Sequence, residues 1–407
     1  MELKPGYKQT EIGVIPEDWE IKTLGDLSRI MTGRTPPTND KSNYGHDIMF
    51  VGPGDLGQAK HIAKSEKMLS CKGFSKAVQI PADSIMITCI GSTIGKVGVA
   101  AKPLATNQQL NSITPNTSYD RDFLYYTLLL SAPVIRTMAS EQAVPIINKT
   151  NISSFKIPYP PLPEQKQICE PINDIDSLIT SLEKLIEKKK LIKQGVMQEL
   201  LTGKRRLPGF SGEWETKRLG DVGQIMKGSG LSKSSLSEDG SSYCILYGEL
   251  FTKYNELIEH PVSKTESTQG LRSQNGDVLL PGSTTTTGID LAKASALMVD
   301  DALIGGDINV LRPLDGMYGP YLALQINTLL KHKIAEKTKG ITIYHLHGKD
   351  LSDIEVQIPS FEEQVQISHV INTLENEIAI LQSKRKKHLL LKQAMMQELL
   401  TGRIRLI

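Results

Sequence analysis

The sequence lacks the features of an exported or membrane-bound protein. Its four cysteines, Cys71, Cys89, Cys169 and Cys244, are scattered and form no CxxC pair, so they indicate neither a disulfide framework nor a redox motif. The N-terminal segment has no apolar signal-peptide core, and no stretch approaches the roughly 18 uninterrupted apolar residues of a membrane span. We therefore expect a cytoplasmic protein that does not enter a membrane.

A strong excess of one charge is also missing. The net charge is only +2, and because a basic face can be balanced by acidic residues elsewhere, this total argues neither for nor against a nucleic-acid partner. Apolar residues make up 39% and charged residues 23% of the chain, which is typical of a folded globular protein. A length of 407 residues suits two domains of ordinary size plus an extended part.

Motifs for phosphate or methyl transfer are absent too. Residues 91–96, GSTIGK, look like a phosphate loop, but only three residues separate the two glycines, and Val97 stands where a magnesium-binding serine or threonine is needed. Residues 158–162, PYPPL, are similar to the Asn-Pro-Pro-Tyr run of adenine methyltransferases, yet no Asn or Asp precedes the prolines. We interpret the first stretch as a glycine-rich turn and the second as a rigid start to a helix.

Nuclease and metal sites have no better support. Glu20 and Lys22, like Glu215 and Lys217, have the Glu-x-Lys form found in restriction nucleases, but alternating charge on an exposed strand explains both pairs. The two histidines of YHLHG at 344–348 could share one face of a strand, but no third metal ligand is apparent. We expect neither a catalytic residue nor a metal site in this chain.

The sequence does contain internal repeats, which lie at the beginning and the end of each half of the chain. Shifted by 199 positions, residues 160–203 align with residues 359–402 without a gap, and about 20 of these 44 positions are identical. Residues 17–33, EDWEIKTLGDLSRIMTG, match residues 212–228, GEWETKRLGDVGQIMKG. The chain is therefore a duplicated unit with similar edges and dissimilar interiors.

Both copies of the longer repeated segment have the pattern of a long helix. Their apolar residues recur at alternating spacings of four and three, which is the seam of a coiled coil. Gly203 and Gly402 are placed to end the helices. Because a helix of about 40 residues is roughly 60 Å long, we expect two antiparallel helices that pack against each other in a pseudo-two-fold arrangement. The seam residues are Ile172, Ile175, Ile179, Leu182 and Ile186 in the first copy and Ile367, Ile371, Leu374, Ile378 and Leu381 in the second.

The interiors between these edges predict compact mixed α/β (α+β) domains. Short β-rich runs such as residues 77–91 and 276–288 are separated by Gly, Pro and Asn turns. A helical pattern follows at residues 120–140 in the first half and at residues 319–338 in the second.

The order of these features closely resembles the specificity subunit of type I restriction-modification systems. Each dissimilar domain is introduced by a W-E-x-x-x-L-G-D element and followed by a Pro-Pro-Leu-Pro-Glu-Gln-like entry into a long helix that ends in LLTG. The resemblance covers essentially the whole chain. It implies two globular target-recognition domains, at residues 1–160 and 206–358, and two long spacer helices, at residues 161–205 and 359–407.

The resemblance implies a noncatalytic subunit that recognises double-stranded DNA. Each recognition domain would read one half of an asymmetric bipartite site, while the helices would set the spacing and dock two methyltransferase subunits. Restriction (motor) subunits would join for cleavage. We then expect no cofactor in this chain, with S-adenosylmethionine, ATP and magnesium bound by the partner subunits.

We expect the DNA contacts to come from basic and small polar residues in loops of the two interiors. These loops are residues 31–45, 91–96, 105–112, 226–240 and 282–288, and solvated loops without a ligand are the alternative interpretation. The candidates are Arg34, Thr35, Lys41, Ser92, Thr93, Lys96, Gln108, Gln109, Lys227, Ser229, Lys233, Thr284 and Thr285.

The helix ends carry more apolar residues than a single seam requires, and burial by partner helices would explain the surplus. Basic runs also occur inside both helices, at residues 188–190 and 384–387, where a solvated face and a DNA- or partner-facing patch are both open interpretations. The partner-binding candidates are Val196, Met197, Leu200, Leu201, Met395, Met396, Leu399 and Leu400.

Two other functions are alternatives to this interpretation. A coiled-coil adaptor whose end domains bind proteins would show no salt-dependent, sequence-specific DNA binding. The recognition part of a larger restriction enzyme would require a catalytic domain, and none is visible in these 407 residues.

Overall fold

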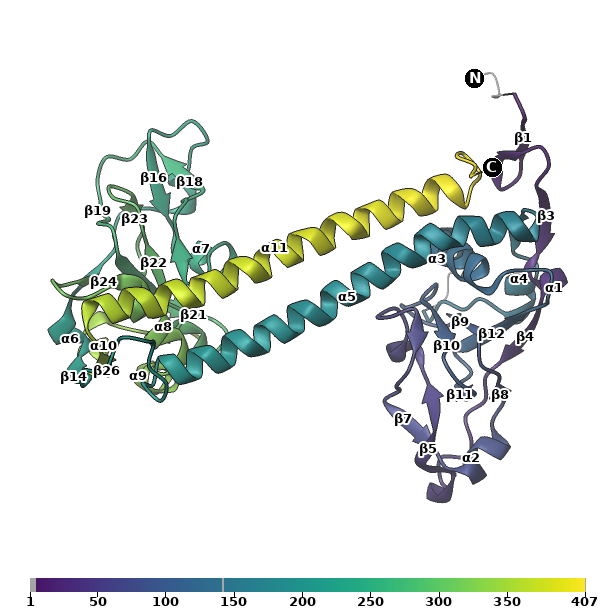
Figure 1. Ribbon diagram of the computed structural model, residues 1–407, viewed down its shortest axis with the longest axis horizontal. Coiled ribbons are helices and arrows are strands. Elements are labelled where there is room, and N and C mark those ends of the chain that lie inside the picture. Colours follow the sequence, from purple (N-terminus) through teal and green to yellow (C-terminus); the bar gives the residue numbers. More distant parts are fainter. Residues whose placement is uncertain (1–4, 141–142, 407) are drawn as a thin grey trace. The chain divides into compact units, whose positions relative to one another are not determined.

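The structure is a computed structural model that describes residues 5–140 and 143–406. The chain divides into two compact units, one formed by residues 1–183 and 383–407 and the other by residues 184–382. The boundary passes through both long helices, α5 (Leu162–Leu200) and α11 (Phe361–Leu399). Each unit therefore consists of one α/β domain and one part of each long helix (Figure 1).

The first unit is built around a five-stranded sheet and a four-stranded sheet. The five-stranded sheet has the order β4 (Ser28–Thr32), β12 (Leu110–Pro115), β9 (Ile85–Thr88), β10 (Val97–Ala100) and β6 (His61–Ile62). The four-stranded sheet has the order β7 (Lys67–Leu69), β5 (Tyr44–Val51), β11 (Leu104–Thr106) and β8 (Gln79–Ile80). Neighbouring strands are antiparallel except β10 with β6 and β11 with β5.

Smaller elements complete this unit. The predicted helix at 120–140 is confirmed as α3 (Arg121–Thr137), which begins at Asp120, whose carboxylate accepts hydrogen bonds from the backbone N–H groups of Asp122 and Phe123. The other elements are β1 (Tyr7–Thr10), β2 (Gly13–Pro16), β3 (Glu20–Thr23), α1 (Leu24–Leu27), η1 (Lys41–Asn43), η2 (Pro53–Asp55), α2 (Cys71–Lys76), α4 (Lys149–Ser153) and β13 (Lys156–Tyr159).

The second unit repeats both sheets in the same strand order. The five-stranded sheet is β15 (Gly223–Lys227), β24 (Ile308–Pro313), β20 (Asp277–Pro281), β22 (Ser295–Leu297) and β17 (Leu257–Ile258). The four-stranded sheet is β18 (Ser263–Thr265), β16 (Ser242–Ile245), β23 (Leu303–Ile304) and β19 (Leu271–Arg272). The parallel pairs, β17 with β22 and β16 with β23, also fall at the same places. The dissimilar interiors thus share one fold.

The helical pattern at 319–338 forms two helices in place of the expected one. α8 (Gly319–Thr328) and α9 (Lys331–Lys337) are separated by Leu329 and Leu330. The backbone N–H groups of both leucines donate to the Gln325 carbonyl, which tightens the turn and buries Leu330 in the core. Further elements are β14 (Glu215–Arg218), α6 (Leu219–Val222), η3 (Lys233–Ser235), α7 (Tyr247–Thr252), β21 (Ser283–Thr284), η4 (Gly288–Leu291), β25 (Tyr344–His345), α10 (Gly348–Leu351) and β26 (Glu355–Ile358).

The ends of the long helices follow the predicted glycines. Gly203 and Gly402 have φ values of 68° and 70°, the left-handed conformation that glycine adopts without a steric penalty. The backbone N–H of Arg205 donates to the Glu199 carbonyl, and that of Ile404 donates to the Glu398 carbonyl, so each helix closes in the same way.

Within each unit the two helix segments run antiparallel. The predicted seam is used, since Ile172 and Ile179 are buried in the first unit and Ile371 and Ile378 in the second. Ion pairs show the direction, because the residue number on one helix falls as that on the other rises. They are Asp176–Lys392 (2.5 Å) and Glu183–Arg385 (2.6 Å) in the first unit, and Lys189–Glu377 (2.6 Å) and Lys193–Glu375 (2.7 Å) in the second.

The Glu-x-Lys patterns are accounted for by their position on exposed strands. Glu20 pairs with Lys22 at 2.8 Å, and Glu215 pairs with Lys217 at 2.7 Å, because residues two apart on a strand share a face. No helix among the described residues is long and apolar enough to cross a membrane. Among the same residues, no group of His, Cys, Asp and Glu side chains gathers in a way that could hold a metal ion.

Candidate nucleic-acid interface

Three loops of the first unit that contain predicted DNA-binding residues leave the same edge of the five-stranded sheet. Thr32 at the end of β4 lies opposite Asn111, and Thr88 at the end of β9 lies opposite Leu110, so β12 begins where both neighbours end. β10 begins at Val97, opposite Ile87. The loops 33–43, 89–96 and 107–109 are therefore brought together at one edge.

Backbone contacts fix the first of these loops against the third. The N–H of Gly33 donates to the Leu110 carbonyl at 3.1 Å, and the N–H of Arg34 donates to the Thr106 carbonyl at 2.9 Å. A Cβ on Gly33 would lie 2.2 Å from the carbonyl oxygen of Asn107, so only glycine allows this close approach. The Arg34 side chain is exposed and has no ion pair among the described residues.

The two predicted glutamines are held through their carbonyl oxygens. Thr35 Oγ1 donates to Gln108 Oε1 at 2.7 Å, and Asn107 Nδ2 donates to Gln109 Oε1 at 2.9 Å. Neither glutamine NH₂ group has a partner among the described residues. Two amide donors are thus oriented by the protein and left available for an acceptor, such as the edge of a base.

A cavity of about 680 Å³ opens beside these amides. Thr35, Asn107 and Gln109 supply polar groups to its lining, and Tyr44 and Phe50 supply aromatic rings. Donors next to aromatic surface suit a planar, hydrogen-bonding ligand. Sequence reasoning missed Asn107, which could have been selected because it directly precedes the two glutamines.

The remaining candidates of the first unit lie in two places. Ser92, Thr93 and Lys96 belong to the 89–96 loop, and the Lys96 stem passes over Gly57, where an added Cβ would lie 3.3 Å from Lys96 Cδ. Lys41 lies near the end of the 33–43 loop, on η1, which packs beside α2. Lys41 and Lys96 have no ion pair among the described residues, so both are available to phosphate groups.

The second unit places its candidates at the corresponding edge. The N–H of Ser229 donates to the Ile304 carbonyl at 3.1 Å, as the N–H of Arg34 does to Thr106 in the first unit. Lys227 lies 3.9 Å from Asp307, which also accepts a hydrogen bond from Ser283. The stretch containing Thr284 and Thr285 begins as β21, which pairs with β25. Lys233 is exposed on η3 and lies in the loop that follows β15.

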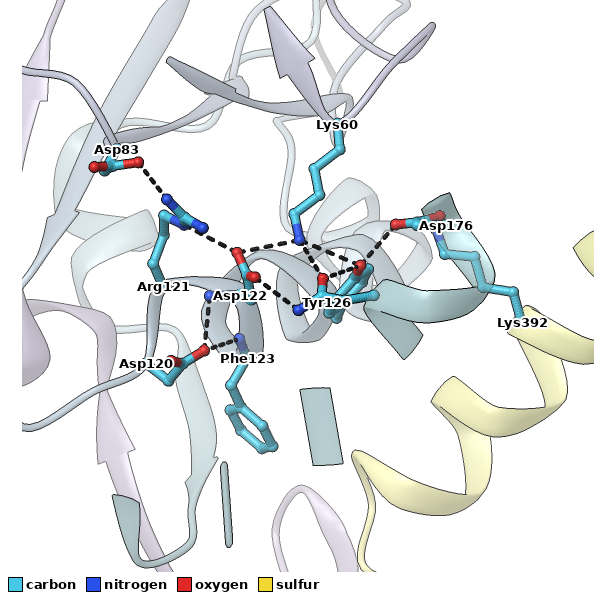
Figure 2. Close-up of polar contacts among 10 residues, drawn as sticks. Lys60, Asp83, Asp120, Arg121, Asp122, Phe123, Tyr126, Asp176 and Lys392 are labelled. Carbon is cyan, nitrogen blue, oxygen red and sulfur yellow. Dashed lines mark hydrogen bonds and ion pairs between the residues drawn. The ribbon is translucent and has the colours of Figure 1, made fainter. Parts of the chain in front are cut away.

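A polar network holds the first domain to its helix segments (Figure 2). Lys60 Nζ lies 2.6 Å from Asn173 Oδ1 on α5 and 3.1 Å from Asp122 on α3. Tyr126 on α3 donates to Asp176 on α5 at 2.6 Å. Asp176 in turn pairs with Lys392 on α11, so the network joins the domain to both helices.

Burial and charge act in opposite directions on this network. Burial lowers the pKa of Lys60, although the charge of Asp122 opposes the shift. Burial alone would raise the pKa of Asp122, but the hydrogen bond from Arg121 and the charge of Lys60 outweigh it and the pKa falls below its ordinary 3.8. In the second unit, Glu256 occupies the position before the edge strand that Lys60 has in the first, and it pairs with Lys193 at 3.5 Å. The residue at this position is therefore basic in the first domain and acidic in the second.

The repeated tails form an equivalent clamp in each unit. In the first, Glu164 accepts from Trp19 Nε1 at 3.0 Å and from two nitrogens of Arg405 at 2.8 Å. In the second, Glu363 accepts from Trp214 Nε1 at 3.2 Å and from two nitrogens of Arg206 at 2.6 Å. In both cases the arginine follows the end of one long helix, and the glutamate lies in the first turn of the other. Sequence reasoning matched the tails but assigned no role to these arginines.

The apolar surplus at the helix ends is buried within each unit. Each unit's own domain packs against these residues, so their burial does not need a partner helix. In the second unit these residues pack with Tyr321 and Ile367, and in the first with Trp19 and Ile168. A partner-binding role for them stays an untested prediction. The buried residues are Leu200, Leu201, Met396, Leu399 and Leu400, and Val196, Met197 and Met395 are half-buried beside them.

A different pair of apolar residues is exposed in each unit. Leu191 is 68% and Leu390 60% exposed, although both lie within long helices. Their neighbours Ile192 and Leu391 are also exposed. Because 191 and 390 differ by the repeat distance of 199 residues, the chain presents the same apolar pair twice.

Comparison with known proteins agrees with this duplicated architecture. The family model of the type I restriction modification DNA specificity domain matches the chain twice, over residues 16–194 and 211–391. The chain therefore belongs to this family of DNA specificity proteins. It is a type I restriction-modification specificity subunit, which is a noncatalytic component.

Relatives of this class match the chain over nearly its whole length or over part of it. The type I restriction enzyme MjaVIII specificity subunit of Methanocaldococcus jannaschii is 23% identical, covering 96% of this chain and 94% of its own. The HindI specificity subunit of Haemophilus influenzae is 39% identical over a shorter region, 28% of this chain and 25% of its own. The crystal structure of the type I S subunit from M. genitalium has the same fold, with a TM-score of 0.62, 15% identity and 98% coverage of both chains.

Proposed function

We propose that the two domains read different halves of one asymmetric, bipartite DNA sequence. The observation that carries this proposal is the pairing of a common fold with different chemistry at the same sheet edge. The first domain presents Arg34 and two glutamine amides there, whereas the second presents Ser229, Lys227 and Asp307. Because hydrogen-bond donors and acceptors decide which base is read, unlike edges imply unlike half-sites.

The long helices would set the distance between the half-sites. In support, α5 and α11 each continue without a break through residues that belong to both units. A helix has a fixed rise of about 1.5 Å per residue, so a change in its length translates into a change in spacing. Dimeric DNA readers set half-site spacing by geometry in a comparable way.

The test is to map DNA methylation in the host genome with and without the gene by single-molecule sequencing. We expect loss of methylation at a single split motif with unlike halves. A palindromic motif would contradict unlike readers, and an unchanged methylome followed by failure of the purified complex to select DNA would favour the protein-binding adaptor.

We further propose that the exposed pairs Leu191–Ile192 and Leu390–Leu391 dock two copies of a methyltransferase subunit. The support is their equivalence under the repeat, since two like surfaces fit two copies of one partner. Restriction subunits would join this assembly in the cytoplasm. S-adenosylmethionine, ATP and magnesium would be bound by those partners.

Mass measurement of the purified assembly tests the docking. Leu191→Glu combined with Ile192→Lys should remove one methyltransferase copy, and the same change at 390 and 391 should remove the other. Leu178→Glu, on an exposed part of α5 outside the repeated pairs, is the matched control. Retention of both copies in the paired variants would contradict this docking surface.

A further inference from the structure

A hairpin in the second unit holds an apolar side chain in solvent. Residues 338–345 connect α9 to β25, and Ile341 at the tip is 93% exposed. Ile343, two residues later, is exposed as well. A single exposed isoleucine is ordinary on a protein surface. The shape, charge and position of this hairpin, however, indicate a binding role for the exposed isoleucine.

The hairpin has a defined shape. The N–H of Lys339 donates to the His345 carbonyl at 2.9 Å, and the N–H of His345 donates to the Lys339 carbonyl at 2.7 Å, which closes the turn. Gly340 has a φ of 127°, and a Cβ there would lie 1.9 Å from the carbonyl oxygen of Ile343. The turn is thus tightly packed on itself and directs Ile341 outward.

Positive charge surrounds the hairpin. Residues 331–349 include five lysines and one glutamate, a net +4 with histidines neutral, although the whole chain carries only +2. Two acidic groups face this region. Asp350 pairs with Lys339 at 3.3 Å, and Asp290 on η4 accepts hydrogen bonds from Thr286 and Thr287. The other lysines have no ion pair among the described residues, and they are Lys331, Lys333, Lys337 and Lys349.

The hairpin is continuous with the candidate interface of the same unit. His345 pairs with Ser283 across β25 and β21. Ser283 donates to Asp307, and Asp307 lies 3.9 Å from Lys227. An apolar tip among unpaired lysines therefore extends the edge at which the second domain presents its predicted DNA-binding residues.

We propose that this hairpin is a DNA-contacting element in which Ile341 packs against a base and the surrounding lysines contact phosphates. Apolar side chains recognise a thymine methyl group or insert between base steps, while lysines supply salt-dependent affinity. The proposal rests on the DNA-recognition function proposed above and adds a residue that a search for polar base-reading groups does not select.

The full chain, bound to labelled duplexes with and without the mapped motif, tests the proposal at several salt concentrations. Ile341→Ser should weaken binding to the motif about ten-fold or more, as expected for loss of a buried isoleucine contact, without changing the salt dependence. Lys333→Ala with Lys337→Ala should weaken binding to both duplexes and lower the slope of log affinity against log salt by about 2.

Leu314→Ser is the matched control, because Leu314 is an exposed aliphatic residue that follows the opposite end of β24 from Asp307. It should bind like the unaltered chain. If the unaltered chain selects the motif and the hairpin variants bind equally well, the hairpin proposal is overturned while the proposed function stands. If Ile341→Ser keeps DNA binding but loses methyltransferase association, the hairpin contacts protein and the proposal is also overturned. If the unaltered chain shows no selection, the underlying function fails first.

Discussion

At the scale of single residues, two buried glutamates give the repeated tail a structural role in each unit. Glu363 is 1% exposed and Glu164 is also buried, so each carboxylate depends on the groups around it. A buried charge is tolerated only when it is paired and hydrogen-bonded. In each unit the repeated tail supplies the arginine that pairs with the buried glutamate.

Arg206→Met should destabilise the second unit by roughly 3–5 kcal/mol, because it leaves Glu363 buried without its ion partner. Arg205→Met is the matched control, since Arg205 is exposed and reaches Glu199 only at 3.4 Å, and we expect a loss of about 0.5 kcal/mol or less. Urea unfolding with hydrogen exchange assigned to each unit measures both. Adding Glu363→Gln to Arg206→Met should recover part of the loss, and equal effects of the two arginine changes would refute the clamp.

At the scale of elements, the position of the first domain on its helices depends on buried charges of opposite sign. Lys60 precedes a short edge strand, and its ammonium group is 3.1 Å from Asp122 on α3. Both side chains are largely buried. The corresponding place in the second unit has Glu256 beside Lys193, so the two domains use different networks for the same attachment.

The lowered pKa of Asp122 gives this attachment a pH dependence. Because the unfolded chain binds the proton more readily than the folded chain, the ionised carboxylate contributes stability above about pH 4, and this contribution is lost as pH falls through the lower pKa of the folded state. Asp122→Asn should destabilise the first unit at pH 7 and make its stability less sensitive to acid below pH 4. Urea unfolding of the first unit between pH 2.5 and 7 measures both effects, with Asp353→Asn, an exposed carboxylate in the second unit, as the control. An unchanged acid dependence would exclude Asp122 as its source.

At the scale of the whole molecule, duplication separates what is shared from what is specific. The sheet order, the clamp and the exposed apolar pair occur in both units, whereas the residues at the sheet edge differ. Changes at one edge should therefore affect one half-site and leave the other half-site and the spacing unchanged.

Gln109→Ala should relax base preference at one position of one half-site, at a cost of about 1–3 kcal/mol for the preferred base. Ser229→Ala, at the corresponding edge of the second unit, should leave the half-site read by the first domain intact. Sequencing of methylated sites in cells carrying each variant measures both halves together. If Gln109→Ala altered both half-sites or the spacer length, independent reading by the two domains would be wrong.

Much of this architecture could be predicted from the sequence. Helix periodicity and glycine caps are local patterns, and the internal repeat is found by comparing the chain with itself. The burial of the seam positions Ile172, Ile179, Ile371 and Ile378, the endings at Gly203 and Gly402 and the mixed α/β interiors are confirmed. The break between α8 and α9 was not predicted, since a buried leucine turn has the same apolar pattern as a continuous helix. The pattern of the apolar surplus at the helix ends predicted burial but not the surface that provides it, and in the structure each unit's own domain packs against these residues.

The sequence by itself determined the duplication, the long helices, the family and the loops that hold the candidate residues, because each of these is carried by order along the chain. Only the tertiary structure decided which distant residues meet. It brought Arg405 to Glu164, placed Gln108 beside Thr35, and left Ile341 and Leu191 exposed. The first contact joins residues 241 apart and the second joins residues 73 apart, and no local pattern of residues records either of them.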